Sequence, residues 1–378
     1  STYPTQNWRV PHLPGIPAGY FLLPPACAEW LSHFTGQPHT PLAQLLDEAC
    51  IDPEALWRVI FGERHQVRQH GPVEQFVNSM LDSGIDVDKL SYLSLDALYT
   101  GVPAGQGIDH ARLMRSAIMV PDRLNMESLA FDMRALPAVE SVIHARLANF
   151  RAIYWHQRNR ALMAMFLHVA DNIDYGRLDE SELRREFLVS SEANVVRRMN
   201  ELYEEHTGRR SPMAMFIPLR GAGLFEELYK VPVADDRQEG FVFNRLTALS
   251  RAEGRGRGGE VRVRKALAEG LRSRYPRLGE VDEAEILIDI PARPMDGRLV
   301  ASLREDRGEP ERIDRISSTA RAAVEDFQKL AKSIRVFVSP RVSRTIGIPD
   351  GEPDTRWMGG LLYEILSGLP GESPGRLS

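Results

Sequence analysis

The sequence predicts a mainly α protein with a smaller C-terminal α+β domain. Helical periodicity, with proline starts and glycine stops, dominates roughly the first two thirds of the chain. Two short β-like runs, EILIDIP at 285–291 and IRVFVSP at 334–340, then flank a helix-like segment at 317–333. The composition, 43% hydrophobic and 26% charged over 378 residues, is that of a globular protein large enough for more than one domain.

The pattern divides the chain into four parts. The first is rich in proline, glycine and histidine and lacks periodicity, which indicates an irregular arm. A helical domain and an α+β domain follow, and the last part reads as a tail whose Gly- and Pro-rich end is typical of disorder. The expected boundaries are 1–40, 41–235, 236–350 and 351–378.

Local signals place each helix. Pro41 and Pro53 lie in the first turns of two short helices, Gly101 is a stop, and Asp109 is an N-cap. The longest apolar-periodic stretch contains no glycine, so we expect one continuous helix there. The predicted helices are 41–50, 53–62, 73–100, 110–119, 137–172 and 179–206.

Composition excludes several functional classes. The net charge of −5 does not favour a chain-wide affinity for nucleic acid. Two cysteines, Cys27 and Cys50, are too few for a disulfide framework and too far apart for a metal knuckle. The most apolar N-terminal stretch, 19–31, contains two prolines and is too short to span a bilayer. We therefore expect a cytoplasmic protein with no membrane partner.

One predicted helix carries acidic residues among its leucines. Asp88, Tyr92 and Asp96 are spaced i, i+4 and i+8, so they share one side of a helix, while Leu93 and Ala97 supply the core side. Carboxylates bind hard divalent cations, and ammonium and phenol groups such as Lys89 and Tyr92 suit phosphate oxygens. A metal-phosphate site and an ordinary amphipathic helix are both compatible with this spacing.

Two spaced motifs resemble those of a known family. IDVDK at 85–89, followed by Tyr92 and Asp96, resembles the closing motif of HD-domain phosphohydrolases. Arg146, followed eight residues later by the Tyr-Trp-His of 154–156, resembles a second family motif. The likeness is to the dNTP triphosphohydrolase branch, which includes the sterile-alpha-motif HD enzyme, and covers roughly residues 40 to 340. It implies an HD-like helical bundle.

The resemblance also implies an activity and a site. The reaction would be hydrolysis of nucleoside or deoxynucleoside triphosphates with a divalent Mg, Mn, Fe or Zn ion. The resemblance also implies that the protein forms a homo-oligomer. Asp88 would be a metal ligand, and Arg146 would act in catalysis by binding phosphate. The other implied substrate contacts, for a dNTP or GTP-like nucleotide, are Lys89 and Tyr92 with the phosphates, Asp96 with a sugar hydroxyl, and Tyr154 near the sugar.

The sequence departs from the family at the metal ligands. None of its ten histidines precedes an aspartate, so the His-Asp dipeptide is absent, and Ser91 replaces an acidic residue. The chain is then a C-terminal fragment, uses substitute ligands, or is a degenerate relative that keeps the fold and nucleotide binding. The missing initiator Met favours a fragment or divergence. The candidate substitute ligands are His12, His33 and His39.

A basic stretch provides a third hypothesis. Residues 251–277 contain nine Arg or Lys and three Glu, a composition that can follow a phosphate backbone. A solvated loop explains the same composition and is the favoured interpretation. A regulatory nucleotide site is a further hypothesis by analogy with the family. The candidate contacts are Arg255, Arg257, Arg262 and Arg264.

Overall fold

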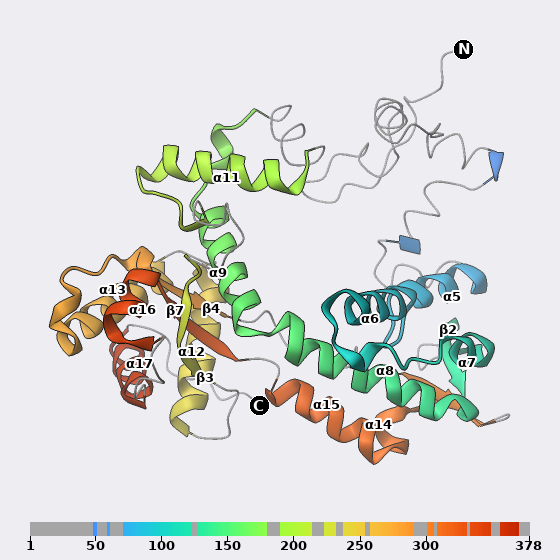
Figure 1. Cartoon of the computed structure of the whole chain (residues 1–378). Helices are drawn as coiled ribbons and strands as arrows, with labels where there is room; N and C mark the ends of the chain where they lie inside the picture. The colour runs from blue at the N-terminus through green and yellow to red at the C-terminus, as the bar shows by residue number, and fades with distance from the viewer. Residues whose placement is uncertain are drawn as a thin grey trace, which may run out of the picture. The chain divides into compact units, whose positions relative to one another are not determined.

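The computed structural model of the protein describes twelve stretches of the chain, and Figure 1 shows their helices and strands. Most of the predicted helices 41–50 and 53–62 lie outside them, as do His12, His33, His39, Arg255 and Arg257. The described residues are 48–50, 59–60, 71–121, 127–179, 190–213, 223–231, 237–253, 258–290, 301–305, 308–330, 333–348 and 356–369.

The chain forms two compact units, and three segments build the first: residues 1–94, 108–142 and 297–318. Two helices contribute only their N-terminal parts to it, namely α6 (Val87–Thr100) up to Ser94 and α8 (Leu136–Asn149) up to Val142. Its other described elements are α5 (Pro72–Leu81), α7 (His110–Ser116), β1 (Ala117–Pro121), β2 (Glu127–Asp132), β5 (Ser302–Arg304), β6 (Glu311–Arg312) and α14 (Ile313–Ile316).

A four-stranded sheet in the order β1-β2-β5-β6 organises the first unit. β1 and β2 form an antiparallel pair, β5 runs parallel to β2, and β6 closes the sheet. Helix α5 packs on β2, and its side chains complete the hydrogen bonding of that strand. Gln75 Oε1 accepts from the Glu127 N–H at 2.9 Å, and Ser79 Oγ accepts from the Leu129 N–H at 2.8 Å. Each bond satisfies a backbone donor that would otherwise be costly to bury.

Two helix predictions in this unit need correction. The segment 73–100 is not one helix but α5 and α6, separated at 82–86, where the hydroxyl of Ser83 donates to the Ile85 carbonyl at 2.8 Å. Asp109 caps α7 as predicted, accepting from the Arg112 N–H. However, that helix ends at Ser116, because Ala117–Pro121 pair with β2 and tertiary pairing outweighs local periodicity.

The second unit comprises residues 95–107, 143–296 and 319–378 and contains a three-stranded antiparallel sheet in the order β3-β7-β4. The strands are β3 (Glu226–Val231), β4 (Ile286–Asp289) and β7 (Ile334–Val338). The predicted strands at 285–291 and 334–340 are thereby confirmed, and they pair directly with each other. Its helices are α9 (Gln157–Asp171), α11 (Glu192–Thr207), α12 (Arg237–Glu253), α13 (Gly258–Arg274), α15 (Ser318–Leu330), α16 (Pro340–Ile346) and α17 (Arg356–Gly368).

Both faces of this sheet are covered, which explains why β4 and β7 are mostly apolar and buried at every position. On one face, Ile288 and Val336 join a core that includes α12, α13 and α17. On the other, Leu287 and Phe337 join a cluster with α9 and α11. Figure 1 shows α9 in green next to β4, which it contacts. Side-chain alternation along a strand therefore assigns each residue of β4 and β7 to one of two helical layers.

The fold class predicted from the sequence is confirmed: the protein is mainly helical with a smaller α+β part. The helix predicted at 317–333 is α15. Residues 356–368, within the segment expected to be a tail, form α17, whose Met358 and Leu362 are fully buried in the core. No helix within the described stretches combines the length and hydrophobicity needed to cross a membrane.

Core packing on α13 should dominate the stability of the second unit. Leu267 is fully buried there, and we expect Leu267→Ala to lower the free energy of unfolding by about 2–5 kcal/mol. The matched control is Leu98→Ala, because Leu98 is 66% exposed and should change stability by less than about 0.5 kcal/mol. Urea titration followed by circular dichroism measures both. Equal effects of the two substitutions would contradict the assigned core.

Candidate functional site

The six residues selected by the sequence motifs divide between the two units. Those in the first unit are Asp88, Lys89 and Tyr92. Those in the second unit are Asp96, Arg146 and Tyr154.

The start of α6 depends on Asp86, the first aspartate of the motif. Asp86 is 3% exposed, and its Oδ1 accepts from the Lys89 N–H at 2.8 Å, which makes it the N-cap of the helix. The Lys89 ammonium forms an ion pair with the same carboxylate and donates to the Ser83 carbonyl at 2.9 Å. Asp86 and Lys89 therefore fix the turn that leads into α6.

Asp88 differs from Asp86 in exposure. It lies in the first turn of α6 and is exposed, so its carboxylate is accessible to a ligand. Lys89 has a side chain only 12% exposed, and to bind a phosphate it would have to exchange its present partners. Tyr92 is half-buried one turn further along, next to Leu93, which is fully buried as the predicted core side requires.

Within the second unit, the structure brings Asp96 and Tyr154 together. The Tyr154 hydroxyl donates a hydrogen bond to Asp96 Oδ2, although 58 residues separate them in the sequence. Both side chains are half-buried. The second carboxylate oxygen of Asp96, Oδ1, offers further acceptor capacity, since an ionised carboxylate accepts several hydrogen bonds.

Tyr154 owes its position to a break in the helix predicted at 137–172. The prediction of one continuous helix is wrong: α8 ends at Asn149 and Phe150–Tyr154 form a π-helical turn. The Trp155 N–H donates to the Phe150 carbonyl at 2.7 Å, and His156 then caps the N-terminus of α9. A π-turn widens the helix by one residue and is frequent at functional sites. Neither a glycine nor a proline marks this break in the sequence.

Arg146 lies in the last turn of α8 and is 2% exposed. Its guanidinium carbon is 5.6 Å from the centre of the Phe150 ring and 5.8 Å from that of Phe327, within the range of cation–π attraction. Phe327, 3% exposed on α15, also packs edge-to-face on Phe150 at 4.6 Å. Phe327 was not identified from the sequence, because an aromatic residue on an amphipathic helix carries no signal beyond core packing.

The described residues do not by themselves form the metal centre that the resemblance implies. Among the described residues, no group of three or more His, Cys, Asp or Glu side chains is arranged to hold a metal ion. A single carboxylate such as Asp88 provides one ligand of the six or more that a hard divalent cation takes from protein and water.

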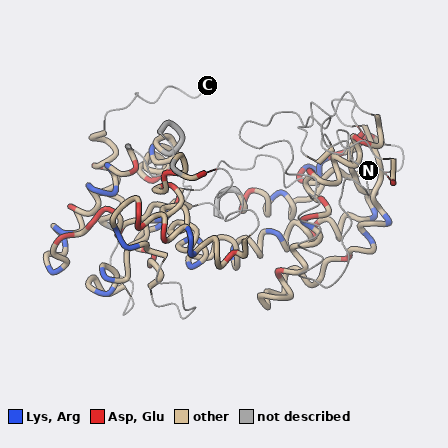
Figure 2. The backbone as a smooth tube through the Cα atoms, turned by 90° about the horizontal axis from the view of Figure 1, so that it is seen from above, with Lys and Arg blue, Asp and Glu red and all other residues tan. Residues whose placement is uncertain are grey.

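Of the four arginines proposed to bind nucleic acid, the two that the structure describes, Arg262 and Arg264, do not share a surface. Arg262 is exposed on α13, whereas Arg264 is 2% exposed on the same helix and does not reach solvent. The Arg264 guanidinium instead meets Glu283 at 3.2 Å and His168 Nδ1 at 3.1 Å. Figure 2 shows basic and acidic positions interspersed along the described backbone.

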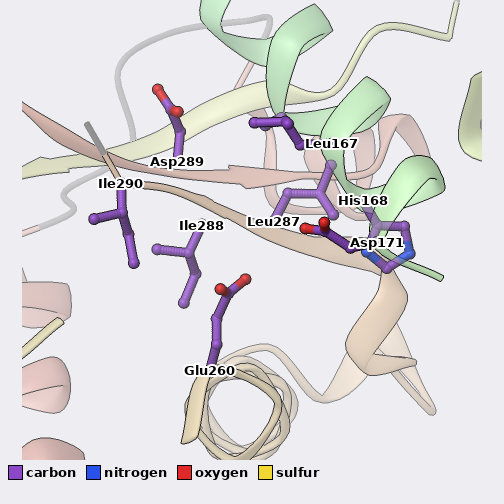
Figure 3. Close-up of a pocket in the computed structure, with 9 residues that line it drawn as sticks. Leu167, His168, Asp171, Glu260, Leu287, Ile288, Asp289 and Ile290 are labelled. Carbon is purple, nitrogen blue, oxygen red and sulfur yellow. The ribbon is translucent and has the colours of Figure 1, made fainter. Parts of the chain in front are cut away.

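A small pocket opens beside α9, α13 and β4. Figure 3 shows that Glu260 reaches toward it from α13 while Ile288 and Ile290 form an apolar side. Its volume of about 20 Å³ is enough for one or two water molecules and too small for a nucleotide. The lining residues are Ala164, Leu167, His168, Asp171, Glu260, Leu287, Ile288, Asp289 and Ile290.

His168, on the wall of this pocket, is held in its neutral form. Arginine has no acceptor, so Arg264 donates to Nδ1, and the ring must carry its proton on Nε2, 3.2 Å from the Tyr203 hydroxyl. Burial, followed by the nearby charge of Arg264, lowers the pKa of His168 from 6.5 to about 3. The imidazole therefore contributes a fixed donor and acceptor to the core.

Comparisons with known proteins give little further information. No family model matches the sequence, and no curated protein matches it. Among solved structures, the crystal structure of a phosphohydrolase from Bacteroides thetaiotaomicron is similar, with a TM-score of 0.47 and 15% sequence identity. The match covers 78% of this chain and 69% of that chain. A likeness of this degree establishes neither a family nor an activity.

The two aspartates at the start of α6 should differ in their effect on stability. We expect Asp86→Ala to lower the free energy of unfolding by about 1–3 kcal/mol, because it removes a cap and leaves the Lys89 ammonium half-buried without its carboxylate. Asp88→Ala, at the exposed position, should cost less than about 1 kcal/mol. Thermal and urea unfolding of both variants measures this. A larger loss in Asp88→Ala than in Asp86→Ala would refute the assignment of Asp86 as the cap.

Stability should fall as the pH drops below that of an unfolded histidine. Between pH 6.5 and 3 the unfolded chain binds a proton at His168 and the folded chain does not, so the folded state loses up to about 1.4 kcal/mol per pH unit. We expect about 2 kcal/mol less stability at pH 5 than at pH 7 from this residue.

Urea titrations at pH 7 and pH 5 measure this dependence. His168→Gln should flatten it, and His144→Gln, at an exposed histidine, should leave it unchanged. If the loss of stability between pH 7 and pH 5 were the same in both variants, His168 would bind a proton in the folded protein as readily as in the unfolded chain.

Proposed function

We propose that this chain is an HD-type phosphohydrolase acting on nucleoside or deoxynucleoside triphosphates. The observation that carries the proposal is the hydrogen bond from Tyr154 to Asp96. The two residues belong to different sequence motifs, which were selected separately, and they meet in the second unit. Two positions taken at random from the chain would not be expected to form a hydrogen bond with each other.

The chemistry of this pair suits a nucleotide sugar. Asp96 Oδ2 accepts from the Tyr154 phenol, which fixes the plane of the carboxylate and leaves Oδ1 to accept from a ribose or deoxyribose hydroxyl. The Tyr154 ring, which packs edge-to-face on Phe150 at 4.9 Å, supplies an aromatic surface with a defined orientation.

Arg146 is the residue proposed to bind phosphate. Arg146 is 2% exposed and flanked by two phenyl rings, so a phosphate reaches its guanidinium only after neighbouring side chains move aside. A cation in such surroundings attracts an anion more strongly than one in bulk water. The planar group also offers two parallel N–H donors to a phosphate, which a lysine cannot.

A second candidate function is nucleotide binding without hydrolysis. It is favoured by the lack of a three-ligand metal cluster in the part of the chain that the structure describes, together with the missing His-Asp dipeptide. Both functions need the contacts of Asp96, Tyr154 and Arg146. They differ only in whether the phosphate bond is broken.

Nucleotide titration tests the proposal. We expect the purified chain, with Mn²⁺ or Mg²⁺, to bind deoxynucleoside triphosphates or GTP in isothermal titration calorimetry. Asp96→Asn and Tyr154→Phe should each weaken binding about tenfold, the equivalent of one charge-assisted hydrogen bond. Tyr363→Phe, at a tyrosine 41% exposed on α17, is the matched control and should bind as the wild type does.

Analysis of the products by anion-exchange chromatography separates the two candidates. Release of nucleoside or nucleotide with inorganic phosphate or triphosphate supports the phosphohydrolase, and binding without turnover supports the second function. Equal affinity of Tyr154→Phe, Asp96→Asn and wild type would reject both.

A further inference from the structure

Trp155, the residue after Tyr154, contacts two arginines of the second unit, one through its backbone and one through its side chain. Arg335 on β7 donates from its Nη2 to the Trp155 carbonyl at 2.9 Å. Arg160, one turn into α9, places its guanidinium carbon 4.5 Å from the centre of the indole ring, a close cation–π contact. The backbone and the side chain of the residue at the helix break are thus both fixed.

Arg160 is in turn fixed by strand β4. Its guanidinium forms a two-pronged ion pair with Asp289, in which Nε donates to Oδ2 at 2.7 Å and Nη2 donates to Oδ1. Asp289 is 2% exposed and the Arg160 side chain 14% exposed. A bidentate geometry defines both the distance and the orientation of the two groups.

The register of the sheet brings these charges to one place. Asp289 and Arg335 are direct partners in the antiparallel pair of β4 and β7. Alternation puts them on the same face as Leu287 and Phe337, the face covered by α9. The charge of Arg335 is balanced by an ion pair with Glu227 on β3, so the group has two cations and two anions.

Such a group is an expensive way to stabilise a fold. Burying an ion pair removes both ions from water at a large desolvation cost, and apolar residues of similar volume often give equal or greater stability. Its specific contribution is geometric, since the fork between Arg160 and Asp289 favours one arrangement of α9 and β4. The arrangement defined here is that of the turn carrying Tyr154.

We infer that Asp289, Arg160 and Arg335 are positioning residues, which hold the helix break at Trp155 so that the Tyr154 hydroxyl meets Asp96. Their importance for substrate rests on the proposed function, but their effect on Tyr154 does not. Active-site geometry in general depends on supporting residues that lock the groups in contact with substrate.

The orientation of Tyr154 can be read directly, without nucleotide. In the full chain labelled with ¹³Cζ-tyrosine, Tyr154→Phe assigns the Tyr154 resonance, and Asp96→Asn gives the shift that accompanies loss of the hydrogen bond. We expect Asp289→Asn and Arg160→Gln each to move this resonance by at least half of that shift. Arg160→Lys keeps the positive charge but loses the two-pronged ion pair, so it should also move the Tyr154 resonance. This variant replaces Asp289→Asn if that protein does not fold.

Arg341→Gln is the matched control. Arg341 forms a comparable fork with Glu285 in the same unit, through its Nε at 2.8 Å and its Nη2. This substitution should leave the Tyr154 resonance in place. An unmoved resonance in Asp289→Asn and Arg160→Lys, or an equal movement in Arg341→Gln, would overturn the inference.

A double-mutant cycle on nucleotide affinity connects the inference to function. If Asp289 acts through Tyr154, Asp289→Asn should weaken binding in the wild type about tenfold and have little further effect in Tyr154→Phe. A full additional loss in the double variant would show that Asp289 acts by another route. Movement of the Tyr154 resonance with no nucleotide binding in any variant would support the positioning role and reject the proposed function.

Discussion

The ion pair between Arg160 and Asp289 is the interaction on which the geometry of the second unit depends. It joins α9 to the edge strand β4, and through Arg160 it also covers the indole ring of Trp155. Because both ends are nearly excluded from water, the pair has one low-energy geometry rather than many. The turn between α8 and α9 is built against this fixed point, and Tyr154 leaves that turn toward Asp96.

The same principle operates at the start of α6, with a different outcome for each charge. Asp86 is committed to the helix cap and to Lys89, whereas Asp88 two residues later is exposed. One acidic motif thus supplies both the local scaffold and a carboxylate that a ligand can reach. Side chains that are buried and paired stabilise the turn, and those left at the surface are available for chemistry.

In the core of the second unit, a buried arginine is paired with a carboxylate and a buried histidine is uncharged. Arg264, 2% exposed, is matched by the carboxylate of Glu283. His168 beside it stays neutral, because burial and then the nearby charge of Arg264 lower its pKa. Arg264 belongs to the basic stretch 251–277, for which a solvated loop was the favoured interpretation and nucleic-acid binding the alternative. Burial of Arg264 could not be read from charge alone, since one helix presents some of its arginines to solvent and others to the core.

The fold class, the strands β4 and β7 and the cap at Asp109 could all be predicted from the sequence, whereas the hydrogen bond between Asp96 and Tyr154 could not. Periodicity, capping residues and motif spacing are local properties, and they are legible without coordinates. The helix break at Trp155 became visible only in the tertiary structure, and so did the roles of Asp86 as a buried helix cap and of Asp88 as an exposed carboxylate. Neither depends on a residue with unusual backbone preferences. The break lies beside contacts such as that of Arg160 with Asp289, made by residues 129 positions apart, which no local pattern encodes. The roles of Asp86 and Asp88 follow from burial, because Asp86 is enclosed with Lys89 whereas Asp88 faces solvent.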